Sequence, residues 1–235
     1  MKIFFIFNLL IYSIIAQNSQ NVYWNSLATD VTVGVPLVDD PTLIGGRVQV
    51  KVSFDNGKTY NEMGDIFTIE KSDIDDLKNI SIPADIFETM PGFIEGGKAQ
   101  FIAKVWDRAG NSVEGAVSDS ILSIDETIPL LVSLKNISSN RKKNLAMPGD
   151  SIIFDLITSE SIKKPRFEIN GELYDDGSVG LDKSWKLIYS ADEADDGPIT
   201  FEINFMDLAG NTGLPITSTS DSLVITMDGT LPEIT

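Results

Sequence analysis

The chain has 235 residues, with 35 acidic against 18 basic side chains, no cysteine and no histidine. These counts exclude disulfides, thiolate metal sites, a cysteine nucleophile, the usual zinc sites and the Ser/His/Asp relay. A formal net charge of −17 repels nucleic-acid phosphate and anionic lipid, so we expect no nucleic-acid partner. Divalent cations and cationic surfaces remain compatible with this charge.

The N-terminus has the pattern of a secretory signal peptide. Lys2 is followed by an apolar run over residues 3–15, which is shorter than the roughly 20 residues that cross a bilayer. Ala16 ends this run before a polar stretch, so we assign residues 1–16 to the signal and expect cleavage after Ala16. The protein is then secreted or at the cell surface, with no membrane span in the mature chain. An uncleaved membrane anchor is the alternative.

Beyond the signal, the hydrophobic pattern has a period of two. Val48, Val50, Val52 and Phe54 alternate with polar residues, which predicts a strand buried on one face. The same alternation predicts a strand over 98–105. Short helices or single turns are expected over 72–78 and 84–89.

The segment SFDNGKTY, residues 53–60, is similar to the Asp-box pattern of sialidase propellers. Its Asn56-Gly57 pair favours a hairpin turn, and Asp55 and Thr59 are placed to bond the turn backbone. A propeller needs this pattern in every blade, so a single copy predicts a hairpin staple and no glycosidase activity.

An internal repeat sets the domain organisation. FIAKVWDRAGNSV at 101–113 recurs as FEINFMDLAGNTG at 201–213, and DETIP at 125–129 recurs as DGTLP at 228–232. The spacing indicates a duplicated unit of about 100 residues, a common domain size. We therefore expect domains over 17–124 and 125–227. Residues 228–235 read as the start of a truncated third repeat, which predicts that the chain is the front of a longer protein.

The second domain has the same strand signature as the first. Ile199, Phe201, Ile203 and Phe205 alternate with polar residues and are expected to face inward. Further strands are predicted at 131–137, 151–157, 185–189 and 222–227. Several short strands separated by Gly, Asn, Asp and Pro clusters indicate an all-β fold of tandem antiparallel sandwiches.

The repeated polar residues fit tight turns and a candidate cation site. Asp107 and Asp207 each end a strand, and a glycine three residues later supplies the positive φ of a reversal. A turn is the simplest explanation for these residue types. The alternative is that Asp107, Asp125 and Glu126 converge at the domain junction and bind Ca²⁺, which prefers hard oxygen ligands.

Residues 125–227 resemble the tandem Ig-like repeats of bacterial secreted and surface proteins. The resemblance is carried by the GD-led strand at 149–157, the pair Ser159-Glu160, the AGN turn and the DxTxP linker. Over residues 20–124 the turn and linker match but the Ser-Glu pair is missing. The resemblance implies Ig-like sandwiches used as a spacer, stalk or adhesive module, and it implies no catalytic residue.

The aromatic and acidic side chains leave several functions open. Trp106 follows Val105, so alternation points it away from the core, where it either packs on a sheet edge or stacks on a sugar. Trp185 is expected in the core. Paired acids such as Asp39 with Asp40 fit glycoside hydrolysis in principle, but solvated turn acids are the ordinary case.

We expect a non-catalytic array that acts as spacer or display module of a larger protein. Its expected partners are neighbouring repeats of the parent chain. The alternatives are an adhesin that binds glycan or protein, and the accessory part of an extracellular enzyme.

Overall fold

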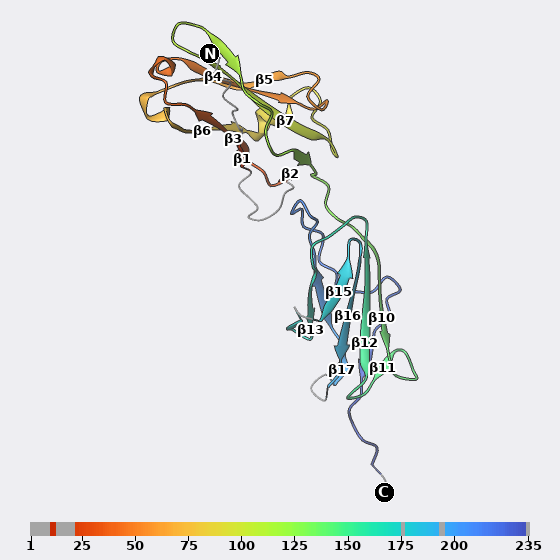
Figure 1. The fold of residues 1–235 in the computed structure, drawn as a ribbon. Coiled ribbons are helices and arrows are strands. Elements are labelled where there is room, and N and C mark those ends of the chain that lie inside the picture. The colour runs from red at the N-terminus through yellow and green to blue at the C-terminus, as the bar shows by residue number, and fades with distance from the viewer. Residues whose placement is uncertain (1–9, 13–21, 175–176, 193–195, 234–235) are drawn as a thin grey trace. The chain divides into compact units, whose positions relative to one another are not determined.

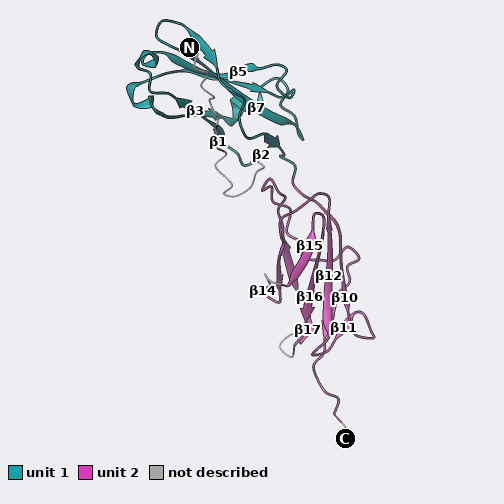
Figure 2. Ribbon diagram, viewed as in Figure 1, with its two compact units in different colours: residues 1–127 teal, residues 128–235 magenta. Residues whose placement is uncertain are grey.

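The computed structural model describes residues 10–12, 22–174, 177–192 and 196–233. It consists of two compact units, residues 1–127 and 128–235 (Figure 2). Both are built almost entirely from strands (Figure 1). The unit boundary follows Thr127, slightly beyond the predicted junction at 124/125.

Unit 1 is a sandwich of two sheets. The first has the order β1-β3-β6, with β1 (Leu10–Tyr12), β3 (Asp30–Leu37) and β6 (Asp76–Pro83). The second has the order β2-β9-β7-β4-β5, with β2 (Val22–Trp24), β9 (Leu122–Ile124), β7 (Lys98–Trp106), β4 (Arg47–Ser53) and β5 (Asn61–Thr68). β8 (Ser112–Glu114) pairs with β7. β2 runs parallel to β9, and the other pairs are antiparallel.

Three short helices connect the strands of unit 1: η1 (Pro41–Leu43), η2 (Lys71–Asp73) and α1 (Ala84–Glu88). α1 confirms the short helix predicted over 84–89. It supplies Phe87, which is fully buried and whose ring packs edge-on against Trp24 with centroids 4.8 Å apart. Most of the segment predicted over 72–78 instead leads into β6. Apart from the strand at 10–12, the predicted signal peptide lies outside the described residues.

Unit 2 is a sandwich with the strand order of an Ig-like fold. One sheet has the order β10-β12-β16-β15, with β10 (Leu131–Ser138), β12 (Ser151–Thr158), β16 (Ser184–Ser190) and β15 (Ser178–Leu181). The facing sheet has the order β14-β13-β18, with β14 (Glu172–Tyr174), β13 (Arg166–Ile169) and β18 (Phe201–Asn204). β11 (Leu145–Ala146), β19 (Thr226–Met227) and β17 (Gly197–Pro198) form a small third sheet. β10, β12, β16 and β15 correspond to strands A, B, E and D of an Ig sandwich, and β14, β13 and β18 correspond to C′, C and F. This order confirms the predicted fold class.

The core of unit 2 follows the predicted alternation with one exception. Ile199, Ile203 and Phe205 are buried, whereas Phe201 is half-buried and packs on the edge of the core. Trp185 is also half-buried against this core. The strand predicted over 199–205 is shorter, because only 201–204 pair along β13.

The last described residues have little packing. Residues 228–233 form no strand, and Leu231 is 84% exposed. Among the described residues, none of the helices is long and apolar enough to cross a membrane.

Candidate functional site

The repeated AGN turns have the same geometry in both units. Asp107 accepts hydrogen bonds from the backbone N–H of Asn111 (2.8 Å) and from its side-chain amide (2.7 Å), and Asp207 makes the same pair of bonds with Asn211 (2.8 and 2.8 Å). Gly110 has φ +97, which a residue with a side chain rarely adopts. The carboxylates therefore close turns, as the sequence predicts.

The two turns differ in burial. Asp207 is 1% exposed and also accepts a bond from the Gly210 N–H at 2.6 Å. Asp107 is only half-buried. Hydrogen bonding from Asn111 holds the pKa of Asp107 below its usual range.

The structure does not bring Asp107, Asp125 and Glu126 together. Asp107 follows the C-terminal end of β7, whereas β9 pairs with the N-terminal end of β7 through Lys98 and Ala99. Asp125 follows β9, so roughly 25–30 Å of strand separates the two carboxylates at about 3.3 Å per residue. The cluster predicted from sequence fails because the strand carrying the AGN turn runs away from the outgoing linker.

Glu126 lies among other acids of unit 1. Its backbone N–H donates to Glu95 Oε2 at 2.9 Å. Burial, together with the neighbouring charges of Glu88 and Glu95, raises the pKa of Glu126. The sequence did not show that Glu126 is partly buried, or that repulsion from Glu88 and Glu95 helps to raise its pKa.

In unit 2 the AGN turn lies at the end where the chain enters. Ser159 Oγ accepts from the Leu130 N–H (2.8 Å), and Ile162 forms an isolated bridge with Asp207. These contacts place the loop after β12 beside the turn. Asp228, by contrast, follows β19, which pairs with Gly197 and Pro198 at the other end of the unit.

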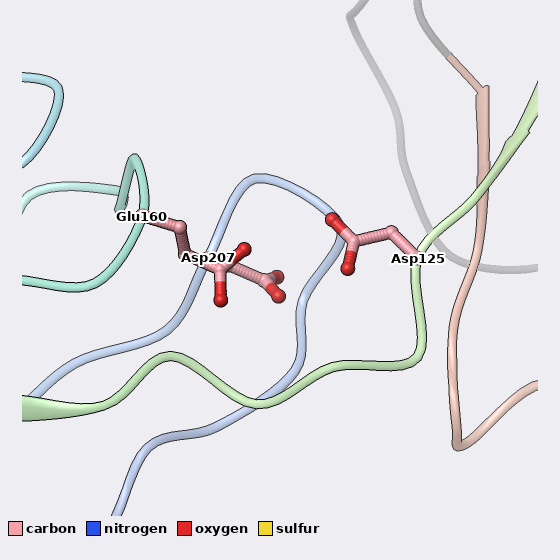
Figure 3. Close-up of side chains that lie close together, drawn as sticks. All are labelled: Asp125, Glu160 and Asp207. Atoms are coloured by element: carbon pink, nitrogen blue, oxygen red, sulfur yellow. The ribbon is translucent and has the colours of Figure 1, made fainter. Parts of the chain in front are cut away.

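Two carboxylates meet at this entry end. Oxygen atoms of Glu160 and Asp207 lie within 4.8 Å of each other, and Figure 3 shows the two side chains adjacent. Figure 3 also draws Asp125, which belongs to the segment leading into unit 2. Carboxylate oxygens at this spacing are ligands of the type that Ca²⁺ prefers. In the sequence, Glu160 stands out only as part of the Ser-Glu pair of the family resemblance, and nothing there predicts that it lies beside the AGN turn.

Trp106 lies on the outer face of the large sheet of unit 1. It is half-buried, while its neighbour Val105 is 6% exposed and belongs to the core. The guanidinium carbon of Arg47 lies 4.6 Å from the centroid of the indole, and Lys104 Nζ lies 4.9 Å from it. Trp106 points away from the core, as the alternation predicts, but the two cations around it could not be predicted from the sequence pattern.

The Asp-box segment forms the predicted hairpin staple between β4 and β5. Asp55 accepts bonds from Thr59 Oγ1 (2.6 Å), from the Thr59 N–H (2.9 Å) and from Ser53 Oγ (2.8 Å). Asn56 and Gly57 both have positive φ, of 62° and 80°. The hydrogen bonds, those of Thr59 first, hold the pKa of Asp55 far below its usual range.

The paired acids are only partly described. Asp40 accepts from the Thr42 N–H at 2.8 Å and so caps η1. Asp175 and Asp176 lie outside the described residues, as does Asp195.

Comparisons with known proteins give remote structural similarity only. No family model and no curated protein matches the chain. Solved structures that match include the FN1–FN3 domains of chicken CNTN1 (13% identity, TM-score 0.39) and a 1.5-MDa bacterial ice-binding adhesin (16%, 0.40). A third is the dimeric latent PorU of Porphyromonas gingivalis (11%, 0.32). The alignments cover 88%, 95% and 97% of this chain, which spans 67%, 65% and 24% of those three chains.

Proposed function

We propose that the chain is a non-catalytic extracellular module in which Ig-like sandwiches space or display another part of a larger protein. The observation that carries this proposal is the use of the repeated acids. The carboxylates of Asp107 and Asp207 both accept hydrogen bonds that close turns. The two units that contain them each have their own core. A rigid sandwich repeated along a chain suits a spacer, because each unit adds length without depending on its neighbour for a core.

Extracellular location is the first test. We expect the full chain, expressed in a bacterial host, to be exported and to lose residues 1–16. Deleting residues 2–16 should keep the protein inside the cell. Retention of the intact chain inside the cell would contradict the proposal, and an N-terminus still beginning at Met1 on an exported chain would favour the membrane-anchor alternative.

We also propose that Ca²⁺ binds at Glu160 and Asp207 of unit 2. The support is the proximity of the two carboxylates, whose oxygens are ligands of the type that Ca²⁺ prefers. Ca²⁺ takes six to eight oxygen ligands, so backbone carbonyls and water must complete such a site. A cation there would fix the turn against the loop after β12 and stiffen the entry end of the unit.

Thermal unfolding in Ca²⁺ and in chelator tests this proposal. At a hundred times its dissociation constant, Ca²⁺ should stabilise unit 2 by about 2.7 kcal/mol. Glu160→Gln should remove the stabilisation by Ca²⁺. Asp125→Asn tests the carboxylate that the sequence analysis named as a candidate ligand. An equal shift with Mg²⁺ that survives Glu160→Gln would indicate charge screening in place of a site.

An adhesin remains the second candidate function. It is favoured by one specific observation, the exposed aromatic and basic surface around Trp106. The third alternative, the accessory part of an extracellular enzyme, would require a catalytic domain elsewhere in the parent protein.

A further inference from the structure

We propose that the outer face of β4 and β7 in unit 1 binds a carboxylate-bearing glycan through Trp106, Arg47 and Lys104. The inference rests on the proposed extracellular location, because acidic glycans are met at cell surfaces and in secreted matrices. It goes beyond the spacer function by assigning a ligand class to a defined surface.

The three side chains are brought together by strand register. Arg47 of β4 stands directly opposite Trp106 of β7, and Lys104 lies two residues earlier on the same face of β7. Both cationic groups are within 5 Å of the centroid of one indole, at 4.6 and 4.9 Å, so they lie no more than about 10 Å apart. Attraction between each cation and the ring restrains two otherwise flexible side chains before any ligand arrives.

The local charge is positive although the whole chain is acidic. Among the described residues, Arg47, Lys104 and the nearby Arg108 form no salt bridge. Glu114 stands opposite Lys104 and interacts with its charge, but its carboxylate pairs with Lys51 at 2.7 Å, and the Asp107 carboxylate binds Asn111. The net charge of −17 is screened beyond about 8 Å at physiological salt, so a ligand at this face meets mainly the local cations.

A sugar acid matches this combination of groups. An arginine fork binds a carboxylate through two parallel hydrogen bonds, and Lys104 adds a second point charge. Arg47 and Lys104 cover part of the indole, so the C–H face of a pyranose ring can stack only on the apolar surface that the two cations leave to the solvent. A uronic acid carries its carboxylate on such a ring, so one residue of the glycan can make both contacts.

The strand pairing disfavours an acidic peptide added as an extra strand. β4 lies between β7 and β5, and Trp106 is paired with Arg47 on one side and with Ser112 of β8 on the other. Backbone groups at the site are therefore used within the sheet, whereas strand addition needs an open edge. Recognition at this face has to come from side chains.

The test is a titration of the full chain with hexagalacturonate at 0.15 M NaCl, followed by calorimetry and by the NMR signal of the Trp106 indole N–H. The fully methyl-esterified hexamer is the matched neutral probe, since it keeps the rings and lacks the charges. We expect hexagalacturonate to bind at least 10-fold more tightly than the ester. Trp106→Ala and Arg47→Gln should each weaken binding at least 10-fold, and Trp106→Phe should retain most of it.

Lys186→Gln, on an exposed position of β16 in unit 2, is the control and should leave the affinity unchanged. Each variant must keep the unfolding midpoint of the parent chain, so that lost binding is not lost folding. The proposal is overturned if no binding is seen up to about 10 mM, if the Trp106 and Arg47 variants bind like the parent, or if hexaglutamate binds as tightly as the glycan. None of these results affects the spacer function, which export and unfolding test separately.

Discussion

Single acidic residues in this protein mainly hold turns. Asp55, Asp107 and Asp207 each accept two or more hydrogen bonds from residues within four positions in the sequence, and Asp150 accepts from Met147 and from the more distant Asn140. The same sequence pattern nevertheless gives two environments, because the AGN turn of unit 2 is buried and that of unit 1 is not. The contribution of the repeated aspartate to the unfolding free energy should therefore differ between the units.

Asp207→Ala tests this difference. The substitution leaves the Gly210 and Asn211 donors without their acceptor at a buried position, and we expect unit 2 to lose about 2–4 kcal/mol of unfolding free energy. Asp107→Ala is the matched variant and should cost unit 1 less, since water can replace the carboxylate. Urea unfolding in chelator measures both. Equal losses would show that burial of the turn does not matter.

The acid sensitivity of Asp55 is a second prediction at this scale. Its folded-state pKa lies below the ordinary value of 3.8, so the stability it provides is present above pH 3.8 and is lost as the pH falls below it. The carboxyl ¹³C shift should show Asp55 still ionised at about pH 3, where an ordinary aspartate is mostly protonated. Thr59→Val removes the largest cause of the lowered pKa and should move the titration of Asp55 toward 3.8. If Asp55 titrates unchanged in this variant, a group other than the Thr59 hydroxyl causes its low pKa.

At the scale of elements, β12 and β18 contribute different amounts to the core of unit 2. β12 is paired on both sides and buries Phe154 completely, whereas β18 is paired along β13 and leaves Phe201 half-buried. The two rings contact each other edge-on, with centroids 5.2 Å apart. The alternating pattern identifies the inward face of each strand but not how fully each position is covered.

Alanine substitution should separate the two phenylalanines. Phe154→Ala is expected to cost about 3–5 kcal/mol, the usual range for a fully buried ring. Phe201→Ala should cost clearly less, because the ring already contacts solvent. Since the rings touch, the double variant should cost less than the sum of the single losses. Chemical unfolding of the full chain gives all three values, and a larger loss for Phe201 would contradict the observed burial.

At the scale of the whole molecule, the two units have separate cores. The buried cluster of unit 1 runs from Trp24 to Ile124, and that of unit 2 runs from Leu134 to Met227. No residue belongs to both clusters. Each unit has the size at which a single core can support folding without disulfides.

A fragment of residues 128–235 should therefore fold alone. We expect a cooperative unfolding transition and the β-sheet circular dichroism of a sandwich. The circular dichroism spectrum of an unfolded chain would show that unit 2 depends on unit 1. NMR amide signals that disperse only when residues 22–127 are present would show the same. Ile203→Ala in the fragment, at a fully buried position, should lower the midpoint as it does in the full chain.

The fold class and the turns could be predicted from the sequence, because both depend on residues that are close together in the chain. Alternation with period two, the Asn56-Gly57 hairpin and the glycines of the AGN turns act over a few residues. Two of the strands that were not predicted are β3 and β5. β3 alternates, with Val31, Val33, Val35 and Leu37 buried, but Gly34 and Pro36 lie within it and weaken the strand signal. The register of β5 shifts where it pairs with β4.

Which polar residues lie close together could not be predicted from the sequence. The direction of β7 carries Asp107 away from Asp125, and the loop after β12 brings Glu160 to Asp207, although 47 positions separate them in the sequence. Register alone sets Arg47 opposite Trp106. A local pattern carries no information on strand direction or register, because both are fixed by packing between segments far apart in the chain.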